Sequence, residues 1–378
     1  MKRFSILLLL TLLYSPLFAG GVTEGQEPSA SGSGTLLVTD ALGRDVQVPR
    51  DPDYIICSGP GALRLATYLQ VEDRVIAVDN MEGRQPAFDA RPYALAHPAY
   101  RDLPVFGEFR GFDNPELILG LEPQPQVIFK TYPSMGYDPL ELEQKTGIPV
   151  VSLSYGDLVD HREDFYQSLR TMAEVLSCQK RAEEVITFIE TAILDIQSRS
   201  SHVAAADRPT CYVGGIAYKG PHGMQSTEPV YPPFYFLHAH NVAFDPSISR
   251  QFQSYSEISK EKLIEWDPDV LFIDISTIQS DDAAGALYGL SHEHIYSYLS
   301  AVQSNEVYGL LPYNWYTQNF GSILADSYFV GSILYPEEFA DMDPVLKADE
   351  IYEFLVGKPV YAELNAAFNG QGFSKIKL

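Results

Sequence analysis

The stretch from residue 157 to residue 208 contains neither glycine nor proline, whereas both recur throughout the segments before and after it. Apolar residues within it follow one another at steps of three and four, as at Phe165, Leu169 and Met172. This spacing places the apolar side chains on one face of a helix. We therefore predict helical structure through this stretch. The longest helix is expected at residues 179–200 and would span about 33 Å at about 1.5 Å per residue.

Short apolar runs alternate with amphipathic stretches on both sides of these helices, a pattern typical of an α/β fold. Before the helices, strands are expected at residues 36–39, 54–57, 74–78, 126–129 and 150–153, and helices at 61–69, 114–121 and 139–146. After them, strands are expected at residues 210–214 and 270–275, and helices at 232–240, 259–266, 292–300, 319–334 and 348–356. The chain thus predicts two α/β halves with helix between them.

The first nineteen residues have the pattern of a secretory signal peptide. Lys2 and Arg3 precede an apolar run, and a small-residue exit follows at Ala19. Residues 20–34 are rich in Gly, Ser, Glu and Pro, which favours a flexible leader rather than a core. We expect an exported protein, periplasmic or extracytoplasmic. No cysteine stands just after the signal, so we expect no lipid anchor through a lipobox Cys; whether the signal is cleaved or retained stays open.

Composition excludes several classes of function. The chain has 26 basic and 50 acidic side chains and a net charge of −24, which argues against nucleic acid as a partner. Cys57, Cys178 and Cys211 are too few and too far apart for a disulfide framework or a cysteine metal site. No G-x-S-x-G, H-E-x-x-H or P-loop motif occurs. We therefore expect no catalytic residues and no enzyme activity.

Four segments resemble the periplasmic binding proteins of iron-complex and corrinoid ABC importers. In chain order they read "VTDALGRDVQVP", "YIICSGPGALRLATYL", "NPELILGLEPQPQVIF" and "YSEISKEKLIEWDPDVLFID". The resemblance covers roughly residues 36–357. It implies an α/β fold of two Rossmann-like lobes, joined by a single long rigid helix, with the ligand cleft between them. The implied divisions are an N-terminal lobe at 35–157, a helical connector at 158–207 and a C-terminal lobe at 208–378.

The resemblance also implies a function. A protein of this kind is the solute-binding component of an ABC importer: it captures a metal chelate, such as a ferric siderophore, haem or a corrinoid, and delivers it to the permease. It needs no catalytic cofactor, and its bound ligand is an iron or cobalt chelate. We expect a monomer. Two alternatives stay open: a surface sensor or adhesin that reuses the fold, and a protein that binds free metal ions.

Glu116 and Glu261 are the candidate contacts with the permease. Each stands at the start of a predicted helix that leads through a Pro-containing turn into a strand. An acidic side chain is favoured at a helix start and is free there for a charge pair with another protein. The resemblance implies that these two carboxylates, one from each lobe, meet arginines of the permease. The alternative is that each merely complements its helix dipole.

The ligand is expected at the loops that follow the carboxyl ends of the strands. These loops carry aromatic side chains that suit a flat or bulky ligand, and cations that suit an anionic one. The unusual loop at residues 214–231 also supplies a histidine. The candidate ligand-binding residues are Arg84, Tyr132, Tyr155, Tyr218, Lys219, His222, Tyr313, Trp315 and Tyr316. Arg64 and Lys130 are further possible partners for anionic groups of the ligand.

A bare metal ion is disfavoured as the ligand. Such a site needs several His and carboxylate ligands in one place. His238 and His240, like His292 and His294, are two residues apart, a spacing that points them to different faces of a helix. We therefore predict no metal-ligating set, although His222 remains a candidate for ligating a chelated metal.

Overall fold

The computed structural model describes residues 34–378, except 84–88, 218–221, 249–254 and 278–284. The predicted signal peptide lies outside the described residues, as do Arg84, Tyr218 and Lys219. No helix in the described part of the chain is long and apolar enough to cross a membrane.

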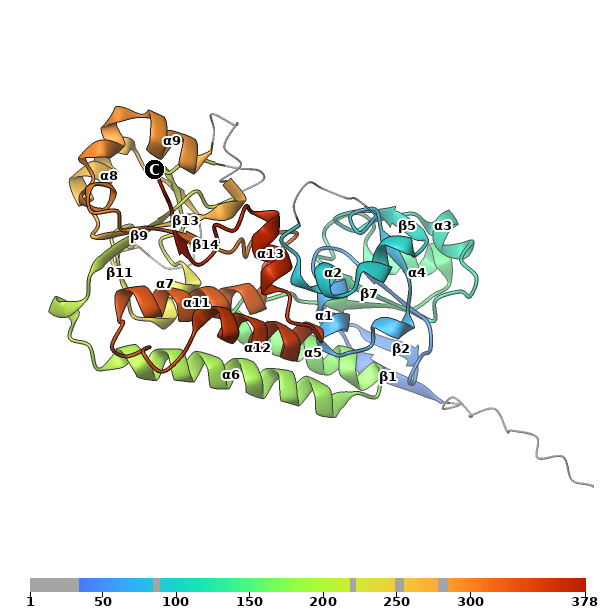
Figure 1. Ribbon diagram of the computed structural model, residues 1–378. Helices are drawn as coiled ribbons and strands as arrows, with labels where there is room; N and C mark the ends of the chain where they lie inside the picture. Colours follow the sequence, from blue (N-terminus) through green and yellow to red (C-terminus); the bar gives the residue numbers. More distant parts are fainter. Residues whose placement is uncertain (1–33, 84–88, 218–221, 249–254, 278–284) are drawn as a thin grey trace, which may run out of the picture. The chain divides into compact units, whose positions relative to one another are not determined.

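The N-terminal half is built on a six-stranded sheet (Figure 1). All neighbouring strands are parallel except the edge pair β5–β6, and β3, β7 and β8 are buried along their whole length. Continuous Val and Ile runs suit such strands because helices cover both faces of a parallel sheet. In spatial order the strands are β6 (Phe112–Asp113), β5 (Val105–Glu108), β4 (Val75–Asp79), β3 (Ile55–Ser58), β7 (Val127–Thr131) and β8 (Val150–Leu153). The helices of this half are α1 (Ala62–Tyr68), α2 (Pro92–Ala96), α3 (Pro115–Leu119) and α4 (Pro139–Thr146).

The C-terminal half is built on a five-stranded sheet, parallel except for its last strand. In spatial order its strands are β11 (His240–Asn241), β9 (Thr210–Gly214), β13 (Val270–Asp274), β14 (Val307–Leu310) and β15 (Ser374–Lys375). Its helices are α7 (Pro232–Phe236), α8 (Lys260–Trp266), α9 (Ala286–His292), α10 (Ser300–Gln303), α11 (Phe320–Leu334), α12 (Pro344–Val356) and α13 (Tyr361–Ala367). Two small antiparallel two-stranded sheets complete the described strands: the hairpin of β1 (Thr35–Thr39) with β2 (Asp45–Pro49), and the pair of β10 (Ser226–Thr227) with β12 (Ser256–Glu257).

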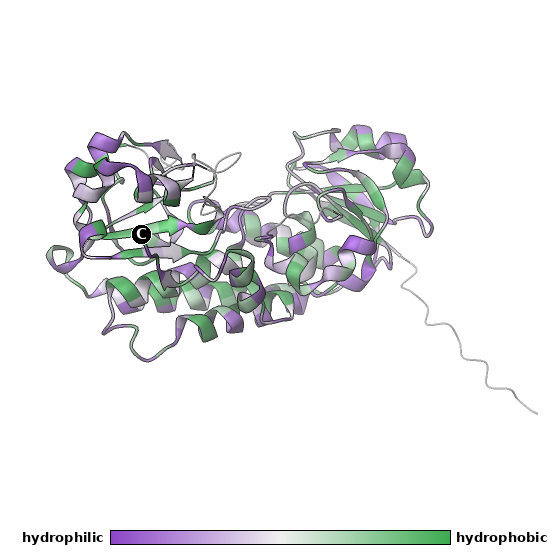
Figure 2. Ribbon diagram, turned by 45° about the horizontal axis from the view of Figure 1, so that its top comes forward, coloured by the Kyte–Doolittle hydropathy of each residue, from purple (hydrophilic) through white to green (hydrophobic). Residues whose placement is uncertain are grey.

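The chain passes from one sheet to the other through α5 (Arg162–Val175) and α6 (Gln179–Ser201). Helix α6 packs against α5 and α11, and α11 in turn packs against α12 (Figure 1). The buried side of α6 runs through Ala182, Val185, Ile189 and Ile193, the three-and-four spacing that predicted the helix. The strands of both sheets are mostly hydrophobic, whereas the helices mix hydrophobic and hydrophilic residues (Figure 2).

The predicted α/β fold is confirmed, as is a long unbroken helix that begins at Gln179. The helix predicted at residues 292–300 is wrong, because Glu293 has an extended backbone that ends α9 and leads into a separate 3-10 turn. Residues 32–378 form one unit by their contacts. The lobe boundaries stay predictions, since helices and loops of the two halves pack against each other.

Candidate functional site

The loop between β14 and α11 lies against the carboxyl ends of the N-terminal strands β7 and β8. The hydroxyl of Tyr132, just after β7, is 2.6 Å from Oγ1 of Thr317. The hydroxyl of Tyr155, after β8, donates a hydrogen bond of 2.7 Å to the carbonyl oxygen of Gln318. The rings of Tyr132 and Tyr155 stack with centroids 6.1 Å apart. Candidate ligand-binding residues from the two halves of the chain therefore meet directly.

Arg64 is buried at the centre of this contact. It is 1% exposed, and its Nη1 donates to the carbonyl oxygen of Gln318 at 2.8 Å and to the hydroxyl of Tyr155. Its Nη2 donates to the carbonyl oxygen of Trp315 at 3.3 Å, and its guanidinium lies 5.1 Å from the ring centre of Tyr93. In this arrangement Arg64 binds the protein's own backbone, so it is not free to bind an anionic group of a ligand.

Tyr316 makes a second contact from the same loop. Its hydroxyl donates to the carboxylate of Asp79 at the end of β4 and accepts a hydrogen bond of 3.1 Å from the backbone N–H of Arg110. Burial raises the pKa of Asp79, and the hydrogen bond from Tyr316 opposes that shift. Tyr132, Tyr155 and Tyr316 are thus brought together on one interface.

Tyr313 points into a different, fully buried cluster in the C-terminal half. Its hydroxyl donates to the carboxylate of Glu228, and its ring lies 5.7 Å from that of Tyr231. Burial raises the pKa of Glu228 to about 8. Burial also raises the pKa of Asp274 to about 7 and that of Asp326 well above its usual range. Burial penalises the charged form of all three carboxyl groups and so raises their pKa values.

Asp326 belongs to this cluster but is not among the candidate residues predicted from the sequence. It is the single charged residue of helix α11, which is otherwise mostly apolar. Its Oδ1 accepts a hydrogen bond of 2.9 Å from the backbone N–H of Leu311, while its Oδ2 is buried with no partner among the described residues. The sequence feature that could have predicted this buried carboxyl is a lone acidic residue within a mostly apolar helix.

The remaining candidates lie beside other aromatic residues. His222 is half-buried, and its ring lies 6.0 Å from that of Tyr255. The ring of Trp315 lies edge-on to Phe368 at 6.4 Å. No group of three or more His, Cys, Asp or Glu that could hold a metal ion occurs among the described residues.

Lys130 is committed to a buried ion pair rather than exposed toward a ligand. Its Nζ lies 2.6 Å from Oδ2 of Asp113, and both side chains are 0% exposed. The same Nζ donates to the carbonyl oxygen of Gly111 at 2.9 Å, and Ser58 Oγ donates to the other oxygen of Asp113 at 2.5 Å. Lys130 is thus fully occupied in holding the β6 segment against β7.

A cavity of about 320 Å³ opens where β7 and β8 end. Tyr132 and Tyr155 form its aromatic wall, and Asp157, His161 and Asp164 line its polar side. It is the size of a small organic group rather than of a whole tetrapyrrole, so it offers one part of a site.

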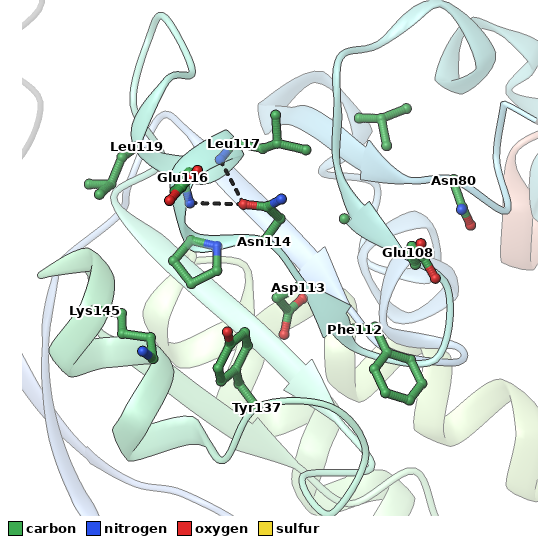
Figure 3. A pocket seen from close by; sticks show the side chains of 13 residues that line it. Asn80, Glu108, Phe112, Asp113, Asn114, Glu116, Leu117, Leu119, Tyr137 and Lys145 are labelled. Atoms are coloured by element: carbon green, nitrogen blue, oxygen red, sulfur yellow. Dashed lines mark hydrogen bonds between the residues drawn. The ribbon is translucent and has the colours of Figure 1, made fainter.

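A larger groove, of about 740 Å³, surrounds the first docking candidate, Glu116 (Figure 3). Pro115 opens α3, and Asn114 caps it: Asn114 Oδ1 accepts hydrogen bonds from the backbone N–H of Glu116 at 3.0 Å and of Leu117 at 3.2 Å. The Glu116 side chain is exposed. The cap fixes the helix start, and the carboxylate is left at the surface.

Glu261 has a corresponding position in the C-terminal half. It is exposed in the first turn of α8, which Ser259 caps by accepting a hydrogen bond of 3.1 Å from the N–H of Lys262. Both candidate docking glutamates therefore stand on short capped helices.

The sequence matches the family model described as "Periplasmic binding protein" over residues 55–313. The chain belongs to this family. The match includes the strands β3, β7, β9 and β13 and ends at Tyr313, so it takes in most of both sheets. The family is one of transport binding proteins and not a class of enzymes. No curated sequence matches this chain.

Solved structures of periplasmic binding proteins share the fold. A periplasmic solute binding protein from Veillonella parvula is 18% identical with a TM-score of 0.68, over 89% of this chain and 97% of that one. The molybdate-binding MolA of Haemophilus influenzae is 18% identical with a TM-score of 0.61, over 86% and 98%. The heme-binding HutB of Vibrio cholerae is 18% identical with a TM-score of 0.53, over 75% and 99%. At these identities the likeness establishes the fold alone.

Proposed function

We propose that this periplasmic binding protein captures a metal chelate, such as a ferric siderophore, haem or a corrinoid, and delivers it to the permease of an ABC importer. The observation that supports this most is the meeting of Tyr132 and Tyr155 with the loop before α11, at the strand ends where ligands bind in such sheets. Named relatives of the same fold bind heme or belong to a ferric hydroxamate transport system.

The ligand site consists of aromatic residues from both halves. Tyr132, Tyr155, Trp315 and Tyr316 supply flat apolar surface and hydroxyl groups, which suit a tetrapyrrole or an aromatic chelate, whereas Tyr313 lies in the separate buried cluster with Glu228. His222 is a further contact, and Arg84, Tyr218 and Lys219 are proposed contacts that lie outside the described residues. Ligand entry requires two hydrogen bonds to open, the one between Tyr132 and Thr317 and the one from Tyr155 to Gln318, since both close the interface when no ligand is bound.

Glu116 and Glu261 are the proposed contacts with the permease. Both carboxylates are exposed, and a charge pair formed across a protein interface contributes orientation and specificity. Neither residue belongs to the interface of Tyr132 and Tyr155, so docking and ligand binding use separate parts of the surface. The protein acts as an exported monomer.

Charge reversal tests the docking contacts. We expect Glu116→Arg and Glu261→Arg to reduce uptake by the host's permease–ATPase complex in proteoliposomes by at least about tenfold, or about 1.4 kcal/mol. Haem and a ferric hydroxamate serve as ligand probes, and their affinities should stay unchanged. The matched control is Glu353→Arg, an exposed glutamate of α12. Normal uptake by both variants contradicts the docking assignment.

Ligand class is tested on protein purified from its own host. Native mass spectrometry and an absorption spectrum should reveal a bound iron or cobalt chelate. Binding of a bare metal ion alone would instead support the free-ion alternative. Tight ligand binding without any transport by the host's importer would support a surface sensor.

A further inference from the structure

The groove beside Glu116 is lined by exposed apolar side chains (Figure 3). Phe112 is 56% exposed, Leu117 47%, Leu119 44% and Val105 42%. They come from β5, from the edge strand β6 and from α3, so residues of three elements line one groove. Exposed apolar side chains that gather around one groove mark an interaction site more often than singly scattered ones do.

The exposure follows from how α3 packs. Of its residues, only Ile118 is buried, in the small core between this sheet and its outer helices. Leu117 and Leu119 flank Ile118 and turn to solvent. Nearly half of the surface of each leucine thus stays exposed, and a partner that covers it gains about 25 cal/mol for each Å² of apolar surface removed from water.

The charges of the groove are unbalanced toward the negative. Within the described part of the chain, neither Glu116 nor Glu108 has an ion-pair partner. The carboxylate of Asp113 is neutralised by Lys130. The one lysine that lines the groove, Lys145, lies 3.7 Å from the carboxylate of Glu141. A matching surface therefore carries positive charge next to apolar side chains.

The surroundings of Glu261 differ. Lys260 and Lys262 flank it in α8, and each pairs with its own acid, Glu293 and Glu265 respectively. The first turn of α8 thus presents a mixed, self-compensated charge pattern in place of two exposed leucines. The two candidate docking glutamates share a position on their helices but not a chemical environment.

We propose that the groove of Val105, Phe112, Leu117 and Leu119 is an apolar anchoring socket for the permease, which inserts a basic side chain flanked by apolar ones. The basic group pairs with Glu116 while its apolar neighbours cover Leu117 and Phe112. The N-terminal half then supplies most of the docking affinity, and Glu261 supplies orientation. This inference rests on the proposed function, since it assumes a permease partner.

The test measures the affinity of the purified protein for the host's permease–ATPase complex in nanodiscs. We expect Leu117→Ser and Phe112→Ser each to weaken binding by about tenfold or more, and to do so at both low and high salt because the lost contact is apolar. Glu116→Arg should weaken binding mainly at low salt. The control is Leu194→Ser, which changes a leucine that is 61% exposed on α6, away from the groove.

The outcomes separate the two proposals. If Glu116→Arg weakens docking but Leu117→Ser and Phe112→Ser do not, the socket is wrong and the docking function stands. If none of the three has an effect, docking through this surface fails altogether. If the parent protein self-associates in sedimentation velocity and Leu117→Ser abolishes this, the socket is an interface between copies of this chain and the proposal is overturned. Unchanged thermal unfolding of each variant shows that folding is intact.

Discussion

Nη1 of Arg64 lies 2.8 Å from the carbonyl oxygen of Gln318, although 254 residues separate them in sequence. The same guanidinium contacts Tyr155 and the carbonyl of Trp315. One buried cation from α1 therefore holds the loop before α11 against the N-terminal sheet. Any opening of the proposed ligand interface has to break the hydrogen bonds of Arg64 to this loop or move the loop together with Arg64.

We expect Arg64→Lys to loosen this loop. Lysine keeps the charge but cannot reach two carbonyls and a hydroxyl with one planar group. Each lost hydrogen bond to a charged donor costs about 1.5–3 kcal/mol, so the free energy of unfolding should fall by a few kcal/mol. Amide hydrogen exchange at residues 313–319 should accelerate in the variant.

The control for Arg64→Lys is Arg170→Lys, which alters a partly exposed arginine paired with Glu163 and Glu183. Exposed pairs contribute about 0–1 kcal/mol, so its unfolding should change little. Equal exchange at residues 313–319 in both variants would contradict the proposed role of Arg64.

Lys130→Met should be strongly destabilising. It leaves the carboxylate of Asp113 buried without its cation, and breaking a buried pair costs about 3–5 kcal/mol. Urea unfolding measures the loss. Lys145→Met, at a pair with 43% and 51% exposed side chains, should cost less than about 1 kcal/mol. The double variant Lys130→Met with Asp113→Leu should recover part of the stability; no recovery would show that the loss is one of packing.

Gly61→Ala should disrupt the contact between the two halves. Gly61 has φ +81°, and a Cβ there would overlap the ring of Tyr155 and approach Thr317 Cγ2 to 2.7 Å. Gly147 has φ +69° with open space around it, so Gly147→Ala costs only the backbone strain of about 1 kcal/mol. We expect Gly61→Ala to exceed that cost by at least about 1 kcal/mol in urea unfolding. Equal costs would indicate that Tyr155 moves aside freely.

The sequence predicted those parts of the fold that depend on local pattern. Continuous Val and Ile runs marked β3, β7 and β13, and the three-and-four spacing marked α6. Strand β14 was not predicted. It is only four residues long and contains Gly309, whose missing side chain lets the backbone of Gln371 pass close by.

The roles of individual cations were harder to predict, because they depend on contacts distant in sequence. Arg64 binds main-chain carbonyls, and a carbonyl oxygen carries no mark in the sequence. Lys130 is a possible partner for an anionic ligand by its position after a strand, yet Asp113 of the edge strand β6 occupies it. The positions of Tyr132 and Tyr155 at strand ends followed from the general topology of parallel sheets. Their role in ligand binding stays a prediction.

The buried carboxyl of Glu228 should make stability depend on pH. Its pKa is raised to about 8 in the folded protein, mainly by burial, from about 4.5. Between these values the folded state holds a proton that the unfolded chain has lost, so stability falls as pH rises through this window. Below about pH 4.5 both states are protonated and the effect vanishes.

Glu228→Gln removes this titration and keeps a hydrogen-bond acceptor for Tyr313. Relative to the parent, the variant should gain stability progressively from about pH 5 to 8, at no more than about 1.4 kcal/mol per pH unit. Urea unfolding at several pH values measures the difference.

Tyr313→Phe is a second variant for the same measurement. It removes the hydrogen-bond donor that lowers the pKa of Glu228, so stability should go on falling with pH to a higher pH than in the parent. A pH-independent difference between the parent and Glu228→Gln would show that Glu228 is already ionised in the folded protein, with its charge compensated.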